Sequence, residues 1–136
     1  MSGPTTIVVG YVPSPEGLAA VDYAVEHARA VGGARIVLVN SGLRGQDSDP
    51  RFASAEDLDA LSARFDAAGL EHEVRQSAQA LSPGEEILAA AEDVGADLIV
   101  IGLRRRSPIG KLFLGSSSQH VILDAACPVV AVKRPE

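Results

Sequence analysis

The 136-residue sequence predicts an α/β protein built around a five-stranded parallel sheet with helices on both faces. Apolar runs and helical patterns alternate from one end of the chain to the other, which is typical of repeated βα units. Three runs are apolar throughout, as parallel strands covered on both faces tend to be. The length and the 46% of hydrophobic residues suit a single domain, residues 1–136, with an aliphatic core.

The strands are expected where these runs fall. The first (TTIVVG), the fourth (LIVIG) and the last (PVVAV) are the fully apolar ones, whereas the third (EHEVRQ) alternates with polar residues and should lie at an edge. A stretch without periodicity, residues 42–54, predicts one long loop. The expected strands are residues 5–10, 35–40, 72–76, 98–102 and 129–133.

The helices between the strands are indicated by their ends. Ser14 and Ser82 are capping serines that each precede a proline, and Glu85 completes a capping box with Ser82. Glycines stop three of the helices, at Gly32, Gly69 and Gly95. One apolar face per helix is expected to cover the sheet, formed by Leu18, Val21, Val25 and Ala28, by Leu58, Leu61, Phe65 and Ala68, and by Ile87, Leu88, Ala91 and Val94.

Composition excludes several classes of function. Eighteen acidic against twelve basic residues give a net charge of −6, which argues against nucleic-acid and anionic-membrane partners. The single cysteine, Cys127, excludes a disulfide within the chain and lies in an apolar run typical of a packed thiol. The N-terminus has no signal-peptide pattern and no apolar run could span a bilayer, so we expect a cytoplasmic protein.

One window departs from the acidic composition. Residues 98–123 contain no Asp or Glu, but they include Arg104, Arg105, Arg106 and Lys111. The window ends in Gly-Ser-Ser-Ser, residues 115–118, where the last helix should begin. Backbone N–H groups at a helix start, with glycine and serine hydroxyls, can hold a phosphate, although a plain helix cap is the alternative for these serines.

Better-known motifs do not fit the sequence. A Walker loop would need glycine at Arg105 and Ser or Thr at Leu112, and the turn after the first strand lacks the GxGxxG fingerprint of a Rossmann dehydrogenase. The histidines His27, His72 and His120 lie far apart with no metal-ligand spacing. There is no GxSxG elbow, and nothing identifies a catalytic base, so we expect a protein that is not an enzyme.

Nearly the whole chain resembles the universal stress protein family. The resemblance rests on the ending DAACPVVAVK and on the family's nucleotide motif: glycine, two residues, glycine, nine residues, glycine, then Ser or Thr. Gly102, Arg105, Gly115 and Ser116 occupy these four places with the spacing intact. Arg105 replaces the second glycine, where its guanidinium would either bond to phosphate or obstruct the backbone's approach. Val12 replaces an aspartate beside adenine, so a different contact to the base is expected.

The resemblance also implies an architecture and a site. The fold would be adenine nucleotide alpha hydrolase-like, or Rossmann-like, with sheet order 3-2-1-4-5 and the ligand where that order reverses. The ligand would be ATP, with or without Mg²⁺. The implied contacts are the backbone at Tyr11, Val12 and Ser41 around the base, Gly102, Arg105 and Gly110 near the ribose and phosphates, and Gly115, Ser116, Ser117 and Ser118 on the phosphates.

The expected function is therefore that of an ATP-binding, stress-responsive sensor or regulatory module. Two alternatives remain open: a nucleotide-free dimeric interaction module of the same family, and a weak ATPase. The last strand would leave an apolar edge exposed in a monomer, and such edges are usually paired or covered. We therefore expect a homodimer in which two of these strands pair antiparallel, as the family suggests.

Overall fold

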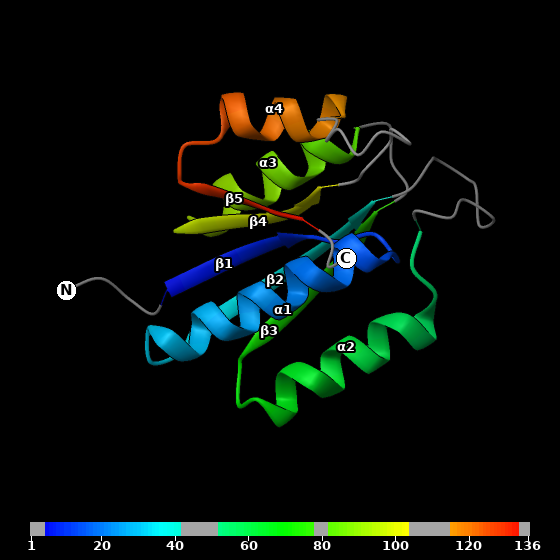
Figure 1. Ribbon diagram of the computed structural model, residues 1–136, viewed down its shortest axis with the longest axis vertical. Coiled ribbons are helices and arrows are strands. Elements are labelled where there is room, and N and C mark those ends of the chain that lie inside the picture. Colours follow the sequence, from blue (N-terminus) through cyan, green and yellow to red (C-terminus); the bar gives the residue numbers. More distant parts are fainter. Residues whose placement is uncertain (1–4, 42–51, 78–81, 104–114, 134–136) are drawn as a thin grey trace.

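The computed structural model describes residues 5–41, 52–77, 82–103 and 115–133, which form three layers (Figure 1). A central sheet contains β1 (Thr5–Gly10), β2 (Ala34–Ser41), β3 (His72–Ser77), β4 (Leu98–Leu103) and β5 (Val129–Lys133). Helices α1 (Pro15–Ala30) and α2 (Ala55–Ala67) cover one face, and α3 (Pro83–Val94) and α4 (Ser116–Asp124) cover the other. The predicted α/β architecture is confirmed.

The sheet has the order β3-β2-β1-β4-β5, and every neighbouring pair is parallel. This confirms both the expected order and the edge position of the third strand. The first and last strands have their predicted bounds, and the other three extend the predicted ranges by one residue at one or both ends. β1 lies at the centre with its four inner residues buried, which explains its continuously apolar sequence.

The helix ends follow the expected local chemistry. Ser14 caps α1 and accepts a hydrogen bond from the Gly17 N–H, while Ser82 and Glu85 form a complete capping box on α3. Gly95 ends α3 in the left-handed conformation, with φ of 63°. A second capping box, formed by Ser54 and Asp57, starts α2 and was not singled out in the sequence.

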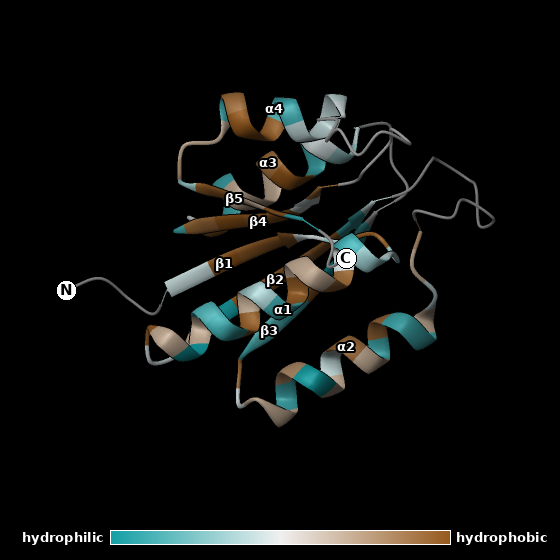
Figure 2. Ribbon diagram, in the orientation of Figure 1, coloured by the Kyte–Doolittle hydropathy of each residue, from teal (hydrophilic) through white to brown (hydrophobic). Residues whose placement is uncertain are grey.

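Two hydrophobic clusters lie on opposite faces of the sheet. Successive residues of β1 alternate between them: Ile7 and Val9 pack under α1 and α2, whereas Val8 packs under α3 and α4. In Figure 2 the hydrophobic residues of the central strands accordingly lie between the two helix layers. Half-buried Cys127 packs against the second cluster, and burial raises the pKa of its thiol, with Asp97 adding to the effect.

The expected apolar face of α1 was wrong at one position. Leu18 is 46% exposed, whereas Ala20 and Ala24 are fully buried against the sheet beside the correctly predicted Val21 and Val25. Small residues allow the helix to lie close to the strands, and Leu18 falls on the flank of that contact. Hydrophobicity alone therefore predicted one residue, Leu18, on the wrong side of the helix.

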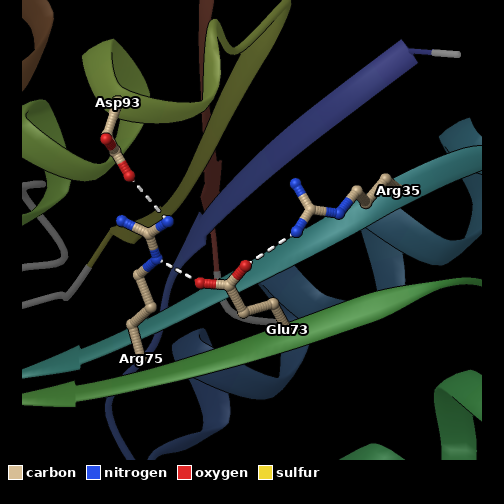
Figure 3. A network of polar contacts seen from close by, with 4 residues as sticks. All are labelled: Arg35, Glu73, Arg75 and Asp93. Atoms are coloured by element: carbon tan, nitrogen blue, oxygen red, sulfur yellow. Dashed lines mark hydrogen bonds and ion pairs between the residues drawn. The ribbon is translucent and has the colours of Figure 1, made fainter.

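The polar edge strand β3 is held by a network of charges (Figure 3). Arg35 on β2 lies 2.7 Å from a Glu73 carboxylate oxygen, Glu73 also pairs with Arg75 on its own strand, and Arg75 lies 2.8 Å from Asp93 on α3. The hydrogen bond from Arg75 is the main cause that lowers the pKa of Glu73. The network joins two strands to the helix above them.

Within the described segments, no helix has the length and apolar character needed to cross a membrane.

Candidate functional site

A cavity of about 140 Å³ opens at the carboxyl ends of β1, β2 and β4. It lies where the strand order of the sheet reverses, between β1 and β4, which is the usual ligand position in doubly wound α/β proteins. The first turns of α1, α3 and α4 border it as well. Its walls are formed by Gly10, Tyr11, Val12, Glu16, Gly17, Val39, Ser41, Pro83, Ile87, Ile101, Gly102, Ser117, Ser118 and Val121.

The structure brings most of the predicted site residues to this cavity. The predicted residues that line it are Tyr11, Val12, Ser41, Gly102, Ser117 and Ser118. Gly115 and Ser116 begin α4 but are exposed and do not belong to the lining. Arg105 and Gly110 lie outside the described residues, as do Arg104, Arg106 and Lys111.

Glycines allow the elements around the cavity to come close together. A Cβ on Gly102 would lie 2.3 Å from the Glu16 carbonyl oxygen, and one on Gly17 would lie 1.9 Å from the Val12 carbonyl oxygen. Both distances are far below van der Waals contact, and the obstructing atoms belong to the backbone. Gly102 is therefore required for the packing of α1 on β4, whatever else it does.

The start of α4 carries backbone N–H groups that no side chain of the described residues caps. Its N-cap is Gly115, no side chain caps it, and the serines follow in its first turn. The alternative that these serines serve as a helix cap is therefore wrong. A Cβ on Gly84 would lie 3.0 Å from the Ser117 carbonyl oxygen, so the first turns of α3 and α4 touch. The start of α4 thus borders the cavity beside the capped start of α3, and its backbone N–H groups would stabilise an anion there.

A buried hydroxyl adds a second polar feature. The Ser41 Oγ at the end of β2 is buried and, among the described residues, finds no hydrogen-bond partner. The neighbouring Asn40 side chain, in contrast, donates to the Tyr11 carbonyl oxygen (2.9 Å) and accepts from the Ala53 N–H (2.9 Å) and from Gln76 (3.0 Å). Because an unpaired buried hydroxyl is costly, Ser41 is suited to bond a ligand in the cavity.

The aromatic ring of Tyr11 points away from this site. It belongs to the hydrophobic cluster under α1 and α2, on the opposite face of the sheet, and the Tyr11 N–H donates to the Val39 carbonyl oxygen at 2.9 Å. Burial, with a smaller effect of Asp57, raises the pKa of its phenol. With its ring in that cluster, Tyr11 has its backbone left to border the cavity, and the expected contact of that backbone with a base stays a prediction.

Several lining residues were not predicted. The strand ends Gly10, Val39 and Ile101 could have been found, because the carboxyl ends of neighbouring parallel strands share one edge of the sheet. Ile87 was predicted only as a core position of its helix, and Val121 was not singled out at all. Glu16 gave no signal beyond a favourable first-turn acid, and its place in the cavity depends on the tertiary packing of α1.

Together, the doubly wound sheet and the cavity at its reversal point define a Rossmann-like α/β protein with a candidate ligand site at the strand ends. The chain belongs to the universal stress protein family, whose model matches residues 4–133. It is 38% identical over 129 residues to a universal stress protein of Mycolicibacterium smegmatis, covering 93% of this chain and 96% of that one.

Solved structures agree with this membership. A universal stress protein from Archaeoglobus fulgidus superposes with a TM-score of 0.78 at 30% identity, covering 97% of this chain and 100% of the other. A universal stress protein from the same organism in complex with dAMP gives 0.68 at 25% identity, covering 98% and 100%. A universal stress protein in complex with cAMP gives 0.71 at 26% identity, with the same coverage. The last two of these structural relatives are thus bound to adenine nucleotides.

Proposed function

We propose that this protein binds an adenine nucleotide, ATP with or without Mg²⁺, and acts as a stress-responsive regulatory module rather than as an enzyme. The proposal rests on two features that border one cavity. The start of α4 has no side-chain cap, and the Ser41 hydroxyl has no hydrogen-bond partner among the described residues. The helix start suits phosphate, and the largely apolar walls beside the Ser41 hydroxyl suit a purine base. The dAMP and cAMP complexes of relatives support the ligand class.

A regulatory role follows from where the ligand would lie. It would contact β1, β2 and β4 and the first turns of three helices at once, so occupancy would favour one arrangement of these elements over another. We place this activity in the cytoplasm, because a chain with a single cysteine suits a reducing compartment. We further propose that the protein works as a homodimer joined through β5, whose outer edge has no neighbouring strand in the described sheet.

The proposal is tested by a matched pair of charge substitutions on α4. Ser118 lines the cavity and Ser116, in the same helical turn, does not, so Ser118→Glu and Ser116→Glu add the same charge to the same helix end. Isothermal titration calorimetry with ATP, with and without Mg²⁺, should show at least about a tenfold loss of affinity for Ser118→Glu and a much smaller loss for Ser116→Glu. Both variants should remain folded, because a first-turn acid is favourable to a helix.

Two results would contradict the proposal. Wild-type protein that binds no ATP at millimolar concentration would exclude ATP as the ligand. Equal losses in the two variants would show that the anion is attracted to the helix end in general and is not held in the cavity.

A further inference from the structure

An acidic side chain lies in this cavity without a partner. Glu16 is only 8% exposed, belongs to the cavity lining, and makes no hydrogen bond or ion pair with any other residue that the structure describes. Its carboxylate oxygens keep some exposure, because the Ser41 Oγ is the only fully buried side-chain oxygen or nitrogen without a partner in the described part of the chain, so they are open to a hydrogen-bond donor that enters the cavity. Glu16 therefore presents an unused hydrogen-bond acceptor to whatever fills the cavity.

Close packing holds the backbone of Glu16 in place and does not involve its carboxylate. It stands in the first turn of α1, where its carbonyl oxygen would be 2.3 Å from a Cβ on Gly102. The helix start is rigid here, since Ser14 caps it and Gly17 packs against the Val12 carbonyl oxygen. Glu16 thus lies beside the end of β4, next to the first glycine of the nucleotide motif.

The chemistry of a carboxylate restricts what part of the nucleotide can face it. An ionised carboxylate only accepts hydrogen bonds, and the phosphate oxygens of a nucleotide are acceptors too, so the two repel each other. The group facing Glu16 must therefore donate. In a nucleotide, the donors are the base amine and the ribose hydroxyls.

The order of the elements around the cavity indicates which of these two donors lies near Glu16. Ser41 and Val39 end β2, Gly102 ends β4, and Ser117 and Ser118 border the cavity from α4. A base against β2 and phosphates at the α4 start leave the sugar between them, beside β4 and the start of α1. A carboxylate that bonds the ribose hydroxyls is also the general solution in dinucleotide-binding α/β proteins.

We propose that the Glu16 carboxylate accepts hydrogen bonds from the ribose hydroxyls of the bound nucleotide, which makes the site selective for ribonucleotides over 2′-deoxyribonucleotides. The inference rests on the proposed nucleotide site and extends it, because it assigns one residue of this chain to the recognition of the ribose. Losing one such charge-assisted bond lowers affinity by about tenfold or more.

The test compares AMP with 2′-deoxy-AMP, two ligands of equal charge, by calorimetry on the full chain. Wild-type protein should bind AMP about tenfold more tightly. Glu16→Gln, which keeps the size of the side chain, should reduce this ratio to a few-fold, and Glu16→Ala should bring it to about one by weakening the binding of AMP more than that of 2′-deoxy-AMP, which loses only the bond from its 3′-hydroxyl. Glu26→Gln is the matched control, because Glu26 is an exposed acid on the same helix, and its ratio should equal that of the wild type.

The outcomes separate the two proposals. If wild-type protein binds both nucleotides equally, or if Glu16→Gln keeps the full ratio, the sugar-reading role is overturned while the nucleotide site stands. A gain in affinity for both ligands in Glu16→Gln also overturns it, since the carboxylate would then act only by repelling phosphate. If neither ligand binds to the wild-type protein, both proposals fall.

Discussion

At the scale of single residues, the glycines of the nucleotide motif have different physical reasons to be glycine. Gly102 is required by the backbone of Glu16, which would lie 2.3 Å from its Cβ. Gly115, in contrast, would place a Cβ in open space, with no atom within 4 Å. The first glycine therefore serves the packing of α1 on β4, and the third leaves the start of α4 open for a ligand.

We expect Gly102→Ala to destabilise the protein by about 1–3 kcal/mol, because neither the strand nor the helix backbone can move aside cheaply. Gly115→Ala is the control and should cost much less, about 1 kcal/mol or below, since only its N-cap preference changes. The free energy of unfolding of both variants can be measured by urea denaturation. Equal destabilisation would show that close packing does not distinguish the two positions.

At the scale of elements, the sequence predicted those features that depend only on residues close together in the chain. The alternation of EHEVRQ identified an edge strand, and Ser82 with Glu85 identified the start of α3, because both signals lie within a few neighbouring residues. Leu18 was misplaced because the sheet prefers small alanines under α1, a matter of packing distance. Glu16 and Ser41 were beyond prediction as unpaired groups, since only the assembled fold shows which polar atoms lack partners.

The network of charges on β3 gives a prediction with a definite dependence on pH. Arg75 lowers the pKa of Glu73 in the folded protein, so this interaction stabilises above the unfolded pKa of the carboxyl and is lost as pH falls through the folded value. Arg75→Met should therefore reduce stability at neutral pH, and the difference from the wild type should shrink as pH falls toward about 3.

Thermal melts at several pH values measure this difference. Arg29→Met is the control, because Arg29 and its partner Glu26 are largely exposed, and it should change stability little at any pH. An Arg75→Met deficit that is constant from neutral to acidic pH would show that the side chain acts through packing rather than charge.

At the scale of the whole molecule, the outer edge of β5 has no neighbouring strand among the described residues, and this is the edge at which we propose that a second copy pairs. The Ile99 N–H donates to the Pro128 carbonyl oxygen, and Ile99 stands opposite Val129 in the parallel register. In such a ladder the backbone groups of Val129 and Ala131 therefore face away from β4. These are the groups that an antiparallel partner strand would bond.

Ala131→Pro removes one of these outward N–H groups without removing a bond to β4. We expect wild-type protein to show a dimeric mass by light scattering at micromolar concentration, and Ala131→Pro to shift it toward the monomer with a melting temperature within a few degrees of the wild type. Ala131→Ser keeps the N–H and should stay dimeric. A monomeric wild-type protein would refute the proposed dimer.

The buried amide of Asn40 has a further consequence for how this family member can vary. One side chain fixes the corner after β1 through Tyr11 and the chain just before α2 through Ala53, so the two ends of the 42–51 connection are tied to the same anchor. Closing a longer connection costs little extra entropy when its ends are already held. Insertions between residues 42 and 51 should thus be accepted with the cavity at the strand ends unchanged, so this connection can vary in length without disturbing the candidate site.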